Sequence, residues 1–199
     1  MAFAKVVEFV DIRAPREEVY NILVDLKRRV QLSPLWGILQ IDRISENYPS
    51  EGSDFQMSIR NNAEFPPFRT VITCCNPLRK LAFRLDVRRK SDVTWTLQDT
   101  QTGTRIIYEE QFEVDDNEGD EFTGKVRTVV TGWLKNIKNY AELREGRLNR
   151  AIKWFLDKYF LNLRKEQRNV VMIILFMQFT SIITFIMAAV AVGVGGLLS

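Results

Sequence analysis

The chain has 199 residues, with 28 Lys or Arg against 25 Asp or Glu and a formal net charge of +3. Hydrophobic residues make up 46% of it, which is enough for one domain with a substantial core. The sequence has no histidine, which excludes His-based acid–base chemistry, Ser-His and Cys-His nucleophiles and the usual His-ligated metal sites. We expect no metal, no cofactor and, without a basic face carrying interleaved aromatics, no nucleic-acid partner.

The first segment of the chain predicts a strand followed by helices. Residues 4–12 are rich in β-branched residues, which is typical of a strand. Pro15 suits the first turn of a helix, and the two glutamates after Arg16 suit its positive end. We therefore expect a first helix from Pro15 to Lys27 and a second short helical turn over residues 29–32.

Short apolar runs alternate with turn residues through the middle of the chain. Their spacing predicts a meander of antiparallel hairpins. One face of each predicted strand is consistently apolar and rich in methionine and aromatic residues, and Glu110 is the one ionisable group placed on these faces. Adjacent Cys74 and Cys75, the only cysteines, should point to opposite faces of a strand as reduced thiols. The predicted strands are 38–45, 54–60, 67–75, 79–88, 92–98 and 104–114.

A long helix is predicted from Asp120 to about Gly146. Its apolar residues form one stripe at three- and four-residue spacing, so one side of the sheet must cover it. Gly124 and Gly132 lie two turns apart in this helix. They indicate either a hinge or close backbone approach beside a cavity, or ordinary tolerance of glycine in a packed helix.

Residues 148–169 form a basic amphipathic segment. From Arg144 to Arg168 there are eight Lys or Arg and three acidic residues. The pattern predicts a helix in the headgroup region of a membrane with its basic side facing anionic lipid. Alternatively, the segment packs on the domain or a partner, or continues into the helix that follows. The residues expected at the interface are Arg150, Lys153, Trp154, Lys158, Tyr159, Arg164, Lys165 and Arg168.

Residues 170–192 predict a single transmembrane helix, because about 20 apolar residues cross the hydrocarbon core of a bilayer. The alternative is a buried helix of a soluble core, although such helices rarely stay apolar on every face. By the positive-inside rule the basic flank and the domain before it face the cytoplasm, and residues 193–199 form a short tail on the far side. The N-terminal residues do not form a basic region followed by an apolar core, so we expect no secretory signal.

The element order β-α-α-β₆-α and four local motifs resemble a known family. The motifs lie at Val7–Tyr20, with an opening strand and an "APxEeVy" helix start, at Leu32–Gly37, at Gly103–Glu110, with a "GTrvtYe" strand, and at Trp133–Leu143 in the last helix. Over residues 3–146 the chain resembles the START-like superfamily, in particular its polyketide cyclase/dehydrase and lipid-transport group, which includes coenzyme Q-binding proteins.

The resemblance implies an α+β helix-grip fold over residues 1–147. In this fold a curved antiparallel sheet of about seven strands wraps around the long C-terminal helix, with an apolar cavity between them. Such a cavity is typical of a ligand site, although each inward residue could equally belong to a filled core. The candidate lining residues are Met57, Phe68, Ile72, Phe83, Trp95, Tyr108, Glu110, Val130 and Trp133.

Tyr108 and Glu110 are the polar candidates within this set. They are two residues apart on one strand, so they could present a hydroxyl and a carboxyl to the same ligand oxygen. A buried carboxyl that keeps its proton could also act as a general acid. Otherwise Glu110 is solvated or paired with Arg84 or Arg69.

These features predict a membrane-anchored domain that binds a hydrophobic small molecule or lipid, such as a quinone, isoprenoid, pigment or acyl lipid. A second hypothesis is a cyclase- or dehydratase-like enzyme, against which the lack of histidine and of a tight acid–base pair argues. A third is an accessory subunit of a larger membrane protein complex, in which the cavity is vestigial and the apolar helix contacts a partner.

Overall fold

The computed structural model describes residues 2–35, 37–60, 66–87, 90–114, 119–143, 147–163 and 165–197. It divides into two compact units, Met1–Lys153 and Trp154–Ser199, and each unit is considered by itself.

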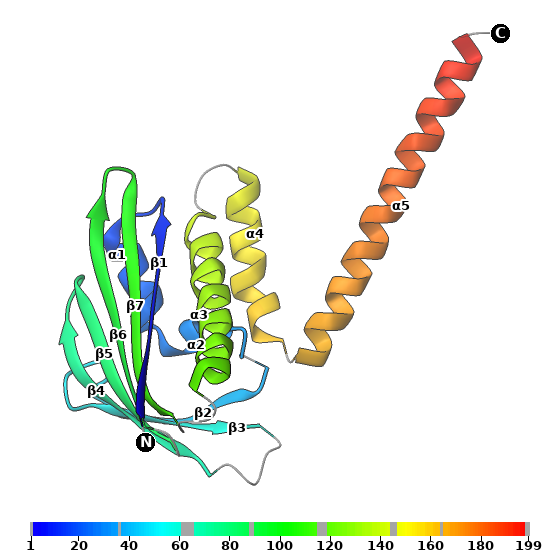
Figure 1. Cartoon of the computed structure of the whole chain (residues 1–199). Coiled ribbons are helices and arrows are strands. Elements are labelled where there is room, and N and C mark those ends of the chain that lie inside the picture. The colour runs from blue at the N-terminus through cyan, green and yellow to red at the C-terminus, as the bar shows by residue number, and fades with distance from the viewer. Residues whose placement is uncertain are drawn as a thin grey trace. The chain divides into compact units, whose positions relative to one another are not determined.

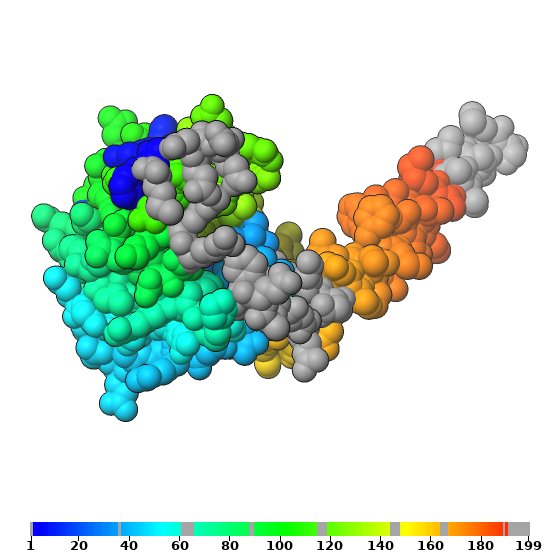
Figure 2. Space-filling view, turned by 60° about the horizontal axis from the view of Figure 1, so that its bottom comes forward, coloured from blue at the N-terminus to red at the C-terminus, as the bar shows by residue number. Residues whose placement is uncertain are grey.

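A seven-stranded antiparallel sheet forms most of the first unit (Figure 1). Its strands are β1 (Ala2–Ile12), β2 (Leu39–Ile44), β3 (Asp54–Ile59), β4 (Phe68–Asn76), β5 (Lys80–Asp86), β6 (Ser91–Thr100) and β7 (Gly103–Val114). In the order β1-β7-β6-β5-β4-β3-β2, the last six strands of the sequence form a meander and β1 pairs with its final strand. Figure 2 shows the meander crossing the surface in colour order, from cyan to green. The predicted strands and the α+β helix-grip class are confirmed.

Alternation along the strands places one face in the core, as the sequence predicts. In β6, Val93, Trp95 and Leu97 are buried. The alternation fails at the end of β4, because the register with β5 shifts between Ile72 and Cys74. Cys74 and its neighbour Cys75 are both half-buried, and both are free thiols.

Two helices follow β1, as predicted, namely α1 (Arg16–Val24) and α2 (Leu26–Leu32), but the first ends at Val24 rather than at Lys27. Asp25 separates them, because its backbone is extended and its side chain accepts a 2.9 Å hydrogen bond from the Arg28 N–H. A side-chain acceptor at this position caps a new helix. The break turns α2 so that Arg29 and Val30 are buried.

The long helix α3 (Gly119–Ala141) lies along the sheet beside β1 (Figure 1). It ends before the predicted Gly146, with a turn at residues 142–143, and residues 144–146 lie outside the described part. A Cβ on Gly132 would lie 3.2 Å from Pro34 Cγ, so this glycine marks a close approach between α3 and the segment after α2, whereas a Cβ on Gly124 would meet nothing within 4 Å.

The remaining helices are α4 (Arg147–Lys158), the short 3₁₀ turn η1 (Phe160–Asn162) and α5 (Lys165–Leu197). The alternative in which the amphipathic segment continues into the apolar helix is therefore wrong, although neither glycine nor proline separates them. The side-chain amide of Asn162 donates to the carbonyls of Asp157 and Lys158 at the end of α4. Arg168 donates back to the Leu161 carbonyl, so side chains satisfy the backbone at this break.

Candidate functional site

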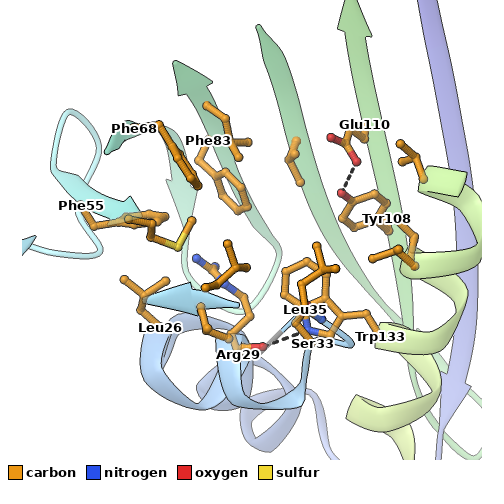
Figure 3. Close-up of a pocket in the computed structure, with 18 of the residues that line it drawn as sticks. Leu26, Arg29, Ser33, Leu35, Phe55, Phe68, Phe83, Tyr108, Glu110 and Trp133 are labelled. Carbon is orange, nitrogen blue, oxygen red and sulfur yellow. Dashed lines mark hydrogen bonds between the residues drawn. The ribbon is translucent and has the colours of Figure 1, made fainter. Parts of the chain in front are cut away.

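A cavity of about 380 Å³ lies between the sheet, α2 and α3 (Figure 3). Its lining is overwhelmingly apolar, with a few polar side chains. Size and composition are those of a small-molecule site. Seven of the nine residues predicted to line a cavity do so: Met57, Phe68, Phe83, Tyr108, Glu110, Val130 and Trp133.

The other two candidates, Ile72 and Trp95, are buried behind the cavity wall at 1% and 0% exposure. Trp95 packs edge-on against Tyr108 and Trp133, at ring-centroid distances of 4.9 and 5.1 Å. It therefore supports two wall residues without lining the space. Strand periodicity predicts which face a residue occupies, but it does not predict whether that part of the face is packed or hollow.

Sequence reasoning missed most of the wall that the helices provide. For the strands the sequence did contain a signal, because Phe55, Leu85 and Val93 fall on the predicted inward faces. The valines of α3 likewise belong to its predicted apolar stripe. For the α2 region no comparable signal existed, because the break at Asp25 decides which residues turn inward. The missed residues are Leu26, Arg29, Val30, Ser33, Leu35, Leu39, Phe55, Leu85, Val93, Phe122, Lys125, Val126 and Val129.

Two hydrogen bonds fix α3 against α2 at one side of the cavity. The indole N–H of Trp133 donates to the Arg29 carbonyl at 2.9 Å, which Figure 3 marks, and the amide of Asn136 donates to the Leu32 carbonyl at 2.9 Å. Both acceptor carbonyls belong to the last turn of α2, where backbone carbonyls have no partner within their own helix. These bonds therefore satisfy the helix end and set the separation of the two helices.

Glu110 belongs to a hydrogen-bond network on the cavity wall. Its carboxylate accepts from the Tyr108 hydroxyl at 2.5 Å and from the Ser91 hydroxyl at 2.6 Å. Burial, together with the adjacent charge of Glu110, raises the pKa of Tyr108 well above its ordinary value. The two arginines expected as alternative partners pair elsewhere, Arg84 with Asp92 and Arg69 with Asp54. Tyr108 and Glu110 thus point together into the cavity, as predicted.

Arg29 is the most buried charge at the cavity. Its side chain is 2% exposed, and the guanidinium carbon lies 4.8 Å from the centroid of the Phe83 ring and 5.8 Å from that of Phe55. Its Nη1 donates to the Leu23 carbonyl at 2.9 Å. Desolvation by burial lowers the pKa of Arg29 from its ordinary value. A buried cation in a cavity wall is a functional-site candidate on physical grounds.

No group of His, Cys, Asp and Glu side chains that could hold a metal ion occurs in the described ranges. The cavity offers hydrophobic burial, the carboxylate network of Glu110, the buried guanidinium of Arg29 and the exposed ammonium of Lys125, which pairs with Glu121.

The apolar helix meets the length and composition needed to cross a membrane over Gln167–Ala188, with a mean hydropathy of 2.4. None of that window is buried in the structure. The apolar side chains from Met172 to Ala188 are accordingly exposed. By length and composition this is one candidate membrane span among the residues that the structure describes.

The predicted interface residues occupy different surroundings. Arg150, Trp154, Lys158 and Tyr159 are exposed, and the Lys158 ammonium lies 5.1 Å from the Trp154 ring centroid. Lys153 instead donates to Glu18 at 2.9 Å and lies over the Tyr140 ring, so this position of α4 packs on the domain. Arg168, in the first turn of α5, is buried against the break that precedes this helix. Arg164 and the side chain of Lys165 lie outside the described residues.

A curved antiparallel sheet around a long helix, with an apolar cavity between them, defines the class as a helix-grip domain. The profile of the Activator of Hsp90 ATPase homolog 1-like protein family matches residues 13–142, and the chain belongs to this family. The START-like superfamily is thus confirmed, whereas the motif resemblance had singled out its polyketide cyclase and coenzyme Q-binding group.

Solved structures with the same fold are distant in sequence. Protein MLL2253 from Mesorhizobium loti has a TM-score of 0.56 and 16% identity, covering 72% of this chain and 100% of that one. The Aha1 dimer from Colwellia psychrerythraea has a TM-score of 0.54 and 14% identity, covering 72% of this chain and 99% of that one. The di-domain ARO/CYC StfQ from the steffimycin biosynthetic pathway has a TM-score of 0.56 and 13% identity, covering 71% of this chain and 51% of that one. A search of curated proteins gave no significant match.

Proposed function

We propose that this protein binds a hydrophobic small molecule or lipid in the cavity between the sheet, α2 and α3, and that α5 anchors it to a membrane. The observation that carries the proposal is the cavity itself, which holds about 380 Å³ of space behind an apolar lining. Filling it with an apolar molecule removes that surface from water, at about 25 cal/mol per Å². The ligand class comprises quinones, isoprenoids, pigments and acyl lipids.

The membrane anchor is the second part of the proposal. It is supported by the window Gln167–Ala188 and by the excess of basic residues that precedes it. With the basic flank on the cytoplasmic side, the binding domain also faces the cytoplasm. An anchored domain would draw its ligand from molecules dissolved in the bilayer.

The test is co-purification. The full chain is purified from its membrane in detergent, extracted with organic solvent and examined by mass spectrometry. We expect one apolar species in stoichiometric amount. Its absence, in protein whose cavity is closed by side chains in an experimental structure, would instead favour an accessory subunit without a ligand of its own.

A cyclase- or dehydratase-like enzyme is the second candidate, and the hydrogen-bonded pair of Tyr108 and Glu110 in the cavity favours it. The similarity in fold to StfQ adds to this candidate without assigning a substrate. Glu110→Gln keeps the shape of the side chain and removes its acid–base function. If this variant loses turnover of the co-purified ligand but still binds it, the result would support the enzyme. If its turnover is unchanged, the result would refute a catalytic role for Glu110.

A further inference from the structure

Arg29 carries a charge that the protein itself leaves largely uncompensated. Arg29 is 2% exposed, and moving a cation out of water is unfavourable unless a counter-charge or hydrogen bonds replace the lost hydration. Across the ranges that the structure describes, no carboxylate forms an ion pair with Arg29. The two aromatic faces of Phe55 and Phe83 compensate part of this cost through cation–π contact.

The hydrogen-bond inventory of Arg29 leads to the same conclusion. A guanidinium has five N–H donors in a planar fork, and one nitrogen of Arg29 donates to the Leu23 carbonyl. The remaining donors belong to a side chain that lines the cavity, and Figure 3 shows the guanidinium projecting from α2 toward Phe83. The buried Tyr48 hydroxyl lies close enough to interact with the Arg29 guanidinium, and the buried Thr70 hydroxyl has no hydrogen-bond partner in the described part of the chain.

The carboxylate of Glu110 does not balance this charge. Its two oxygens accept from Ser91 and Tyr108, and no ion pair joins it to Arg29. Arg29 and Glu110 lie well apart in Figure 3, on α2 and β7. The cavity wall therefore carries the hydrogen-bonded carboxylate of Glu110 and, separately, the guanidinium of Arg29, which has N–H donors beyond the one that the Leu23 carbonyl accepts.

We propose that the ligand carries a single carboxylate-type anion at one end of its apolar body and that Arg29 binds this group. A carboxylate matches the planar fork of a guanidinium and can accept two parallel N–H bonds. The other cation of the lining, Lys125, is exposed and pairs with Glu121 at 2.6 Å. Arg29 is therefore the cation that neutralises a buried negative charge here, and a monoanion fits this wall better than a doubly charged phosphate. The inference rests on the proposed binding function and narrows its ligand class to hydrophobic monocarboxylates.

The experiment compares two photoreactive probes of equal length, a long-chain carboxylic acid and the matching primary alcohol, each with a diazirine in the chain. Both are supplied at the same mole fraction to the full chain in lipid nanodiscs, at a slightly alkaline pH that ionises the acid. After irradiation, peptide mass spectrometry maps the labelled residues. Labelling of α5 reports supply from the membrane, and labelling of cavity residues relative to α5 reports binding.

We expect cavity labelling, relative to α5, to be about tenfold greater for the acid than for the alcohol, because a hydrogen bond to a charged group contributes on this scale. Arg29→Met should abolish the preference while retaining alcohol labelling, and Arg29→Lys should retain part of it. Arg28→Met is the matched control, because its guanidinium lies over Tyr140 and does not line the cavity, and it should leave the preference unchanged.

Equal cavity labelling by acid and alcohol in the wild type overturns the assignment of Arg29 and leaves the binding function standing. This comparison requires no variant, so it decides the question even if Arg29→Met does not fold. An acid preference that persists unchanged in folded Arg29→Met also overturns it. Labelling of α5 by both probes with no labelling of the cavity refutes the binding function itself.

Discussion

Tyr108 couples the stability of the domain to alkaline pH. Burial and the charge of Glu110 raise the pKa of Tyr108 in the folded state, whereas the unfolded state ionises near pH 10. Above that pH the unfolded chain loses a proton that the folded chain keeps, so the free energy of unfolding falls as pH rises. Burial also raises the pKa values of Tyr20 and Tyr48, which act in the same direction.

We therefore expect Tyr108→Phe to reduce this alkaline loss of stability. The slope of unfolding free energy against pH should become less steep by up to about 1.4 kcal/mol per pH unit above pH 10. Denaturant titrations monitored by tryptophan fluorescence measure the slope, with Tyr159→Phe as the control for removing an exposed hydroxyl. Superimposable slopes for wild type and Tyr108→Phe would contradict the coupling.

The site residues show what a sequence can and cannot predict at this scale. Tyr108 and Glu110 were predictable because strand alternation fixes their common face. Arg29 was not predictable as a buried wall residue, because a single arginine in a short basic helix is usually solvent-exposed. Its burial follows from the helix break at Asp25 and from the contact of α2 with α3, which are both tertiary effects.

At the scale of elements, the two glycines of α3 make a matched pair. Gly124 faces open space, so alanine there gains helix propensity without a new contact, whereas a Cβ on Gly132 would meet Pro34 at 3.2 Å. We expect Gly124→Ala to raise the free energy of unfolding by about 1 kcal/mol and Gly132→Ala to give a smaller gain or a loss. Denaturant titration measures both, and equal gains would contradict the close approach at Gly132.

Element boundaries were the least predictable part of the fold. The strands could be predicted because alternation and turn residues repeat across the meander. The breaks at Asp25 and at residues 159–163 depend on single side chains that satisfy backbone groups, namely the Asp25 carboxylate, the Asn162 amide and the Arg168 guanidinium. Side-chain capping of this kind competes with helix continuation wherever the pattern alone favours a longer helix.

At the scale of the whole molecule, α5 should decide where the protein resides. We expect the full chain to remain in the membrane fraction after extraction with alkaline carbonate, because Gln167–Ala188 is long and apolar enough to span the bilayer. A chain ending at Leu163 lacks the span and should move to the soluble fraction. Release of the full chain by carbonate would contradict the transmembrane anchor.

The most direct test of the binding function is native mass spectrometry of the full chain released from lipid nanodiscs. The account predicts ions carrying one apolar ligand for the wild type and for Thr131→Trp, which enlarges an exposed position of α3. It predicts loss of the ligand in Val129→Trp, which places an indole at a residue that lines the cavity. Ligand-free wild-type ions, or a ligand retained equally by both tryptophan variants, would contradict it.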